Sequence, residues 1–264
     1  MSGRNAPRTL TVTPLPAEGV RSIDSFSVAR ICDPASFSEL LGAFRKVEAE
    51  HRQQGRCLLT LDDVDQCLYT SMHALEAHHL DDGIDYPEHD DPAARAAYDA
   101  ALFRAVSAAL RDPVRARTWD EVSLFTEPSD IDALVALNRD PGLVLDDVHM
   151  VQCLPADDDT DLLANIPNGY FKGDWTPFDC HAVARRIGAQ HGYALFGIGA
   201  STLGFHSAVG LEERDLPALV ADLQHLYGYH DSPAWTDLAT VLRSSPVLLL
   251  GYTEGFAEAT EASS

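Results

Sequence analysis

Apolar residues recur three or four positions apart in several stretches of the chain, which is the spacing that places them on one face of a helix. Four of these stretches open with a capping residue followed by proline, as in Asp91-Pro92 and Thr176-Pro177. Such a proline is tolerated because its missing N–H would be unpaired at the first helical position. The pattern therefore predicts helices that begin near residues 33, 63, 91, 129, 176, 215 and 232.

Shorter apolar runs, bounded by turn residues, predict strands. They lie at 9–13, 25–31, 57–59, 148–154, 193–198, 202–208 and 247–252. The second half of the chain then has the order β-α-β-β-α-α-β, whereas the first half is mostly helical. The sequence thus predicts an α+β fold, in which the second half forms a small mixed or antiparallel sheet packed with helices.

The same pattern indicates where the ordered part of the chain begins, divides and ends. Residues 1–8 and 254–264 lack a hydrophobic period and are predicted to be a disordered N-terminus and a disordered tail. Between them, the change of pattern near Asp112-Pro113 separates a helix-rich half, 9–112, from an α+β half, 113–253. Nothing at this point has the composition of a flexible linker, so one continuous domain over 9–253 is the alternative.

The charge balance changes the functional picture more than the fold. Forty-one Asp and Glu residues face 19 Lys and Arg residues, which gives a formal net charge of −22. A field of this sign repels the phosphates of nucleic acids and anionic membrane surfaces, and it favours a positively charged protein partner. The same excess also keeps a protein soluble, which is the competing explanation.

Features that the sequence lacks indicate the compartment of the protein and whether it carries a cofactor. No apolar run approaches the roughly 20 residues that cross a bilayer, and the first residues carry no apolar signal segment. Five widely spaced cysteines without a CxxC pair indicate reduced thiols rather than disulfides or a zinc site. We therefore expect a cytoplasmic protein with no cofactor, whose Arg-rich and Ala-rich composition is typical of bacteria. The oligomeric state stays open.

The segment 165–181 holds the densest group of candidate binding residues. A turn signal at Asn168-Gly169 precedes three aromatic residues, a rare lysine and the cap of the helix that begins near 176. A helix N-terminus beside a lysine and an indole can hold an anion or an acidic side chain. A helix entry packed by aromatic residues is the competing explanation and the one that the pattern favours. The candidate binding residues are Asn168, Tyr170, Lys172, Asp174 and Trp175.

Histidines supply the remaining candidates. His206 lies on the strand predicted after the glycine turn at 199–201, where it can face a cleft. His79, Asp82 and His89 form the best metal-like group, but their spacing matches no defined metal signature. An exposed acidic loop at a helix end explains them better, so we predict no metal site.

These observations support two leading hypotheses. The first is an acidic cytoplasmic protein-binding module, of the kind exemplified by an inhibitor or an immunity-type protein that neutralises a cationic partner. The second is a small-molecule enzyme or metal-binding protein with a site formed by 165–181 and His206, because catalytic residues often converge only in three dimensions. A structural or regulatory subunit is the third. Whether the protein is an enzyme stays open, since no catalytic motif is present.

Overall fold

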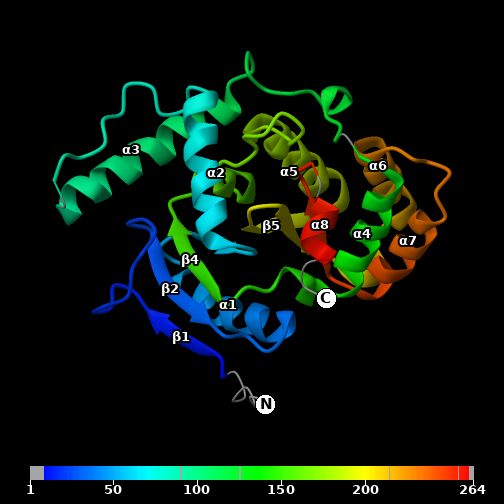
Figure 1. Ribbon diagram of the computed structural model, residues 1–264, viewed down its shortest axis with the longest axis horizontal. Helices are drawn as coiled ribbons and strands as arrows, with labels where there is room; N and C mark the ends of the chain where they lie inside the picture. The colour runs from blue at the N-terminus through cyan, green and yellow to red at the C-terminus, as the bar shows by residue number, and fades with distance from the viewer. Residues whose placement is uncertain (1–8, 90, 125, 214, 255, 262–264) are drawn as a thin grey trace, which may run out of the picture.

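A seven-stranded mixed sheet carries strands from both halves of the chain. The computed structural model describes residues 9–89, 91–124, 126–213, 215–254 and 256–261, and within them the strands lie in the order β1-β2-β4-β3-β5-β6-β7 (Figure 1). The strands are β1 (Thr11–Pro14), β2 (Ser27–Cys32), β3 (Arg56–Thr60), β4 (Val148–Leu154), β5 (Tyr193–Ile198), β6 (Thr202–Ser207) and β7 (Val247–Gly251). The mixed α/β character that the sequence predicts is confirmed.

The direction of the strands decides which loops meet at each edge of the sheet. β3 and β5 pair in parallel, whereas every other pair of neighbouring strands is antiparallel. It follows that β2, β3, β5 and β7 all run the same way. Their carboxyl ends therefore lie at one edge of the sheet, together with the loop that leads into β4.

Helices cover both faces of the sheet. They are α1 (Phe37–His51), α2 (Val64–Ala77), α3 (Pro92–Arg111), α4 (Pro128–Arg139), α5 (Pro177–His191), α6 (Leu216–Tyr227), α7 (Ala234–Ser244) and α8 (Phe256–Glu261), with the short 3-10 turns η1 (Trp119–Glu121), η2 (Pro141–Val144), η3 (Asp159–Ala164) and η4 (Leu211–Glu213). No helix in the described ranges combines the length and the apolar character that crossing a bilayer requires.

The alternating side chains of the strands divide the buried apolar residues into two cores. On one face, Leu59 and Val151 pack with Phe44 of α1. On the other face, Leu58 and Phe205 belong to a larger core that includes residues of α3 to α8. A sheet that is buried on both faces leaves its edges, rather than its faces, to form a site.

The halves suggested by the sequence do not correspond to separate layers in space. β4 belongs to the segment 113–253, yet it lies in the sheet between β2 and β3 of the segment 9–112. The strands of the mostly helical first half are therefore integral to the sheet. The prediction missed this because strand order depends on pairing between residues far apart in the sequence.

Two helix boundaries differ from the prediction for identifiable reasons. The first helix begins at Phe37 rather than after Asp33, because Asp33 has a positive φ of 54° and donates its N–H to the Asp147 carbonyl. Ser36 caps the helix instead, accepting the Glu39 N–H at 3.2 Å.

At the C-terminal end of the chain, disorder is predicted from 254 on, but residues 256–261 form α8. Phe256 is buried and packs on Tyr227, which anchors this helix. The predicted disordered residues 1–8 lie outside the described residues.

Candidate functional site

A cavity of about 1000 Å³ opens at the edge where the carboxyl ends of β3, β5 and β7 meet. This is the edge at which sheets with parallel strands commonly bind ligands. The cavity walls come from the loop after β3, the turn after β5, the segment after β7, the loop before β4 and the loop before α5. Six of the side chains that line it are carboxylic acids, namely Asp62, Asp63, Asp146, Asp174, Glu254 and Glu258.

Asp62 ties the loop after β3 to the turn after β5. Its carboxylate accepts hydrogen bonds from the Ser201 N–H at 3.2 Å, the Ser201 hydroxyl at 2.9 Å and the Thr202 hydroxyl at 2.7 Å. Gly199 permits this contact, since a Cβ there would overlap the carboxylate. Burial raises the pKa of Asp62, although the hydrogen bonds from Thr202 and Ser201 act in the opposite direction.

Asn168 and Gly169 hold the opposite wall against α2. The buried Asn168 amide donates to the Cys67 carbonyl and to Cys67 Sγ, both at 3.1 Å, and its oxygen accepts a hydrogen bond from the Thr70 hydroxyl. Gly169 has a φ of 103°, and a Cβ there would overlap the Trp175 carbonyl oxygen. This wall is therefore a fixed part of the structure, in which a side chain at residue 169 has no room.

Asp174 and Glu254 are neighbouring acids in the lining of the cavity. Asp174 accepts the Phe171 N–H at 3.2 Å and the Glu254 N–H at 3.1 Å. Burial raises the pKa of Asp174 from 3.8 to about 6, and the nearby negative charge of Glu254 adds to this rise. Near neutral pH, the cavity thus holds carboxylates whose ionisation is opposed by their surroundings.

The lining contains no compensating positive charge. Among the described residues that line the cavity, none is a Lys, Arg or His. The described residues also contain no group of three or more His, Cys, Asp or Glu side chains arranged to hold a metal ion. The six acids therefore line the cavity without converging on one point.

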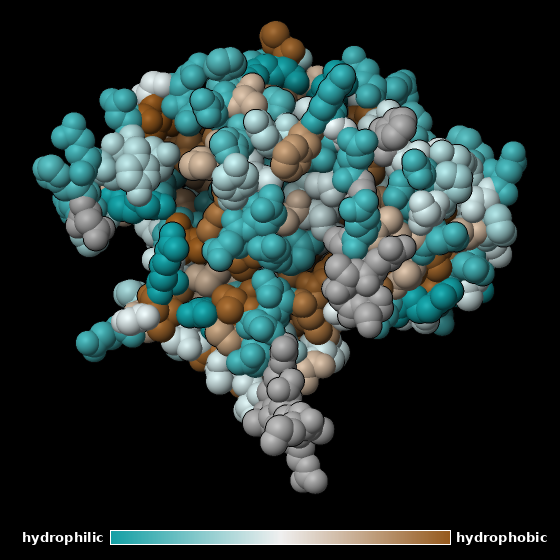
Figure 2. Space-filling view, viewed as in Figure 1, coloured by the Kyte–Doolittle hydropathy of each residue, from teal (hydrophilic) through white to brown (hydrophobic). Residues whose placement is uncertain are grey.

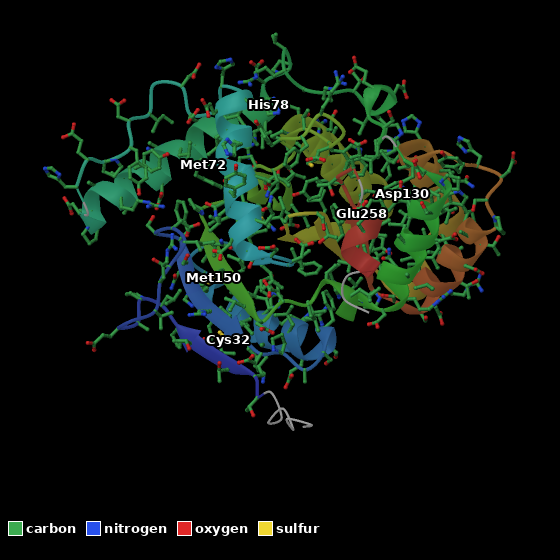
Figure 3. The ribbon with its side chains drawn as sticks, viewed as in Figure 1. Cys32, Met72, His78, Asp130, Met150 and Glu258 are labelled. Carbon is green, nitrogen blue, oxygen red and sulfur yellow. The ribbon has the colours of Figure 1, made fainter. Side chains whose placement is uncertain are left out.

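The surface around the cavity mixes charge with exposed hydrophobic groups. Figure 2 shows hydrophobic residues among hydrophilic ones at the centre of the face on which α2 and α8 lie. Figure 3 marks Glu258 on α8 and Met72 on α2, two exposed side chains of this face. The aromatic ring of Phe171 is also exposed and lines the cavity.

The structure separates the candidates that the sequence grouped together. Asn168 and Asp174 line the cavity, whereas Tyr170 and Lys172 are exposed beside it. Trp175 is 1% exposed and belongs to the core, where it packs on Tyr227 and donates its backbone N–H to the Tyr252 carbonyl. The Trp175 indole therefore packs in the core and does not line the cavity.

His206 lies in a different cavity, of about 780 Å³, at the opposite end of the strands. Its Nε2 meets the Arg45 guanidinium, and burial together with the Arg45 charge lowers the pKa of His206. Arg52 and Arg56 also line this cavity, as do Glu48, Asp157 and Asp159. His206 and the segment 165–181 therefore do not share one site.

The metal candidates remain apart from both cavities. His79 Nδ1 lies 3.5 Å from Asp82 Oδ2, and both side chains are more than two-thirds exposed, at 76% and 72%. His89 is exposed on the following loop. No third ligand joins the His79–Asp82 pair within the described residues.

Five cavity acids were missed by sequence reasoning, which singled out Asp174 alone. A signal was present, since Asp62 and Asp63 come shortly after the strand at 57–59, Asp146 lies two residues before the strand that begins at 148, and Glu254 closely follows the strand that ends near 251. Acids at the ends of strands that share one edge converge.

Comparison with family models, curated proteins and solved structures finds no match for this chain.

Proposed function

We propose that this protein is an acidic, cytoplasmic binding module that recognises a cationic partner through the cavity at the carboxyl edge of the sheet. One observation carries the proposal, namely that six carboxylic acids line the cavity without any Lys, Arg or His among its described lining residues. An inhibitor or immunity-type protein for a basic protein is the class of molecule that this arrangement fits.

The electrostatics of the cavity support a cationic occupant. Like charges that lie close together raise one another's free energy, and partial burial strengthens the effect because water screens them less. A guanidinium or ammonium group placed among them lowers that free energy. The raised pKa of Asp174 fits this interpretation, since burial and the nearby Glu254 charge disfavour its charged form.

The charge of the whole chain supports a macromolecular partner of opposite sign. A net charge of −22 accelerates association with a basic protein and weakens association with nucleic acids. A catalytic role is the weaker proposal, because His206 and the acids of the main cavity lie at opposite ends of the strands.

Calorimetric titration with N-acetyl-arginine amide tests the cavity directly. Both ends of this probe are blocked, so its guanidinium is the only charge. Glu254 and Glu258 are suitable for mutation because both side chains are exposed and neither forms an ion pair with another described residue. We expect the Glu254→Gln, Glu258→Gln double variant to bind the probe roughly tenfold more weakly, from the loss of two partly screened attractions.

A matched control separates the site from the overall charge. The Glu50→Gln, Glu212→Gln double variant changes the net charge equally at exposed acids outside the cavity, and we expect less than a twofold change in affinity. Equal weakening in the two double variants would mean that the probe senses only net charge. That result, or an absence of binding to the wild type, would reject the proposal.

A further inference from the structure

A row of four aromatic rings leads along the surface from α2 to the cavity. Ring centroids lie 4.5 Å apart between Tyr69 and His73, 5.0 Å between His73 and Tyr170, and 5.2 Å between Tyr170 and Phe171. The first two rings come from α2 and the last two from the loop that lines the cavity. Residues about 100 positions apart in sequence thus form one continuous aromatic surface, named here the aromatic row.

Three of the four rings of the aromatic row are exposed, and His73 is half-buried. Tyr69 is 53% exposed, Tyr170 is 42% and Phe171 is 53%. Met72, one helical turn from Tyr69, is 58% exposed. In the described part of the chain, four of the nine exposed large hydrophobic side chains therefore gather on α2 and the loop beside it. Aromatic residues and methionine are enriched in protein interfaces relative to other surfaces, so such a group indicates a contact surface.

The aromatic row and the acidic cavity are continuous. Phe171 is the last ring of the row and also a lining residue of the cavity, and its N–H donates to Asp174 at 3.2 Å. A ligand that fills the cavity with a cationic group therefore meets an aromatic ring at the cavity wall. Aromatic faces attract guanidinium and ammonium groups, and they also pack against apolar side chains.

Charge decides between the occupants that such a surface can take. A second copy of this chain would bring another −22 to a surface that is already acidic, and the mutual repulsion opposes a homodimer. A small cation would fill the cavity and leave the aromatic row uncovered. Four rings about 5 Å apart extend over a length on the order of five residues of an extended peptide, at roughly 3.3 Å per residue.

We propose that the aromatic row and the cavity form one recognition surface for a polypeptide segment of a basic protein. The segment places an arginine side chain in the cavity, and its neighbouring aromatic or apolar residues lie along the rings of Tyr69, His73, Tyr170 and Phe171. This inference rests on the proposed function, because it specifies which cationic partner the cavity takes.

Two blocked peptides test the inference. In the peptide Trp-Gly-Arg-Gly-Trp, aromatic residues flank the arginine, whereas Gly-Gly-Arg-Gly-Gly carries the same charge without them. We expect the tryptophan peptide to bind wild-type protein at least tenfold more tightly than the glycine peptide does. The affinity of N-acetyl-arginine amide should be close to that of the glycine peptide. The Tyr69→Ala, Tyr170→Ala double variant should remove most of that difference and leave the binding of N-acetyl-arginine amide within twofold of the wild type.

The control removes exposed apolar surface elsewhere. Tyr86 and Val114 are 61% and 89% exposed and lie outside the cavity, so the Tyr86→Ala, Val114→Ala double variant should bind both peptides as the wild type does. Circular dichroism and thermal unfolding check that each variant folds. Because Tyr69 and Tyr170 are both exposed, their truncation leaves the core unchanged.

The possible outcomes separate this inference from the function on which it rests. If both peptides bind wild-type protein equally, or if the tyrosine variant keeps the tenfold difference, the aromatic row is not part of the site, while the cavity proposal stands. If the Glu254→Gln, Glu258→Gln variant binds every probe like the wild type, both proposals fail. If sedimentation shows a wild-type dimer that the tyrosine variant abolishes, the row is a homodimer interface and the inference is wrong.

Discussion

The two ends of the strands hold cavities of similar size, one lined by acids alone among its described charged residues and the other by acids and bases together. At the carboxyl edge, six acids line the wall, and none of the described lining residues is basic. At the other end, Arg45, Arg52, Arg56 and His206 face Glu48, Asp157 and Asp159. There Arg56 pairs with Asp159 and also donates to the Asp157 carbonyl at 3.2 Å.

The difference shows that net charge alone does not locate a site. Where acids and bases alternate, the protein compensates its own charges, so an incoming ion gains little binding free energy. Where acids stand together without a basic neighbour, a cation from outside the chain has the most negative charge to neutralise, as the proposed function requires. The excess of 22 negative charges is thus informative chiefly through its uneven distribution between these two cavities.

The largest effect is expected where the wall of the acidic cavity is most tightly constrained. At Gly169, alanine meets a φ of 103° and a backbone oxygen in the place of its Cβ. We expect Gly169→Ala to lower the free energy of unfolding by about 3 kcal/mol or more, from a left-handed backbone and overpacking together. Urea unfolding measures this loss.

Gly83 provides the matched control for that substitution. Its φ is 77°, but no atom lies within 4 Å of an added Cβ. Gly83→Ala should therefore cost only about 1 kcal/mol, which is the backbone contribution by itself. Equal losses of unfolding free energy at the two glycines would show that the cavity wall rearranges to accept a Cβ at residue 169. The acidic cavity would then be no more rigid than its surroundings.

The second effect concerns the pH dependence of stability. The pKa of Asp174 is raised in the folded protein from 3.8 to about 6, so the folded state binds more protons than the unfolded state between these values. The contribution of Asp174 to stability is therefore full below pH 4 and is lost as the pH rises through 6. The full difference in pKa corresponds to about 3 kcal/mol, and because water partly screens this group we expect a loss of about 2 kcal/mol. We expect Asp174→Asn to flatten the stability profile between pH 4 and 7, measured by urea unfolding at each pH.

The third effect follows from the same carboxyl group. A guanidinium in the cavity favours the charged form of Asp174, so binding releases protons where the group is partly protonated. N-acetyl-arginine amide should bind several-fold more weakly at pH 5 than at pH 7.5, by up to about tenfold. Titration in buffers of different ionisation enthalpy counts the released protons. An affinity independent of pH would place the guanidinium away from Asp174.

The sequence predicted most strands because apolar runs report local burial. The runs at 148–154 and 193–198 match β4 and β5 at both ends, and Thr176 caps α5 as its Thr-x-x-Asp pattern indicates. Phe256 was missed because it is the single large apolar residue of the predicted tail 254–264, and its burial depends on contact with the distant Tyr227. Tertiary contact, rather than local pattern, orders that helix.

The candidate site was predictable only in part, for a related reason. Asp174 was identified because its segment combined a turn, a lysine and aromatic residues within a few positions. Asp62, Asp146 and Glu258 lie in separate segments, and they meet only because β3, β5 and β7 share one direction in the sheet. Asn168 was predicted as a binding residue, and in the structure its amide bonds to Cys67 and Thr70 make it part of the cavity wall.

The smallest effect belongs to the compensated cavity and has the opposite sign. Burial lowers the pKa of His206, and the neighbouring Arg45 charge lowers it further, so the folded state binds fewer protons than the unfolded state. Its contribution to stability is present above the unfolded pKa of about 6.5 and is lost as the pH falls toward the lower folded value. His206→Gln, which keeps a neutral acceptor near Arg45, should remove this slope near pH 6 and leave the Asp174 slope unchanged. If His206→Gln instead altered the binding of N-acetyl-arginine amide, the two cavities would be coupled, and the electrostatic contrast between them would no longer define the site.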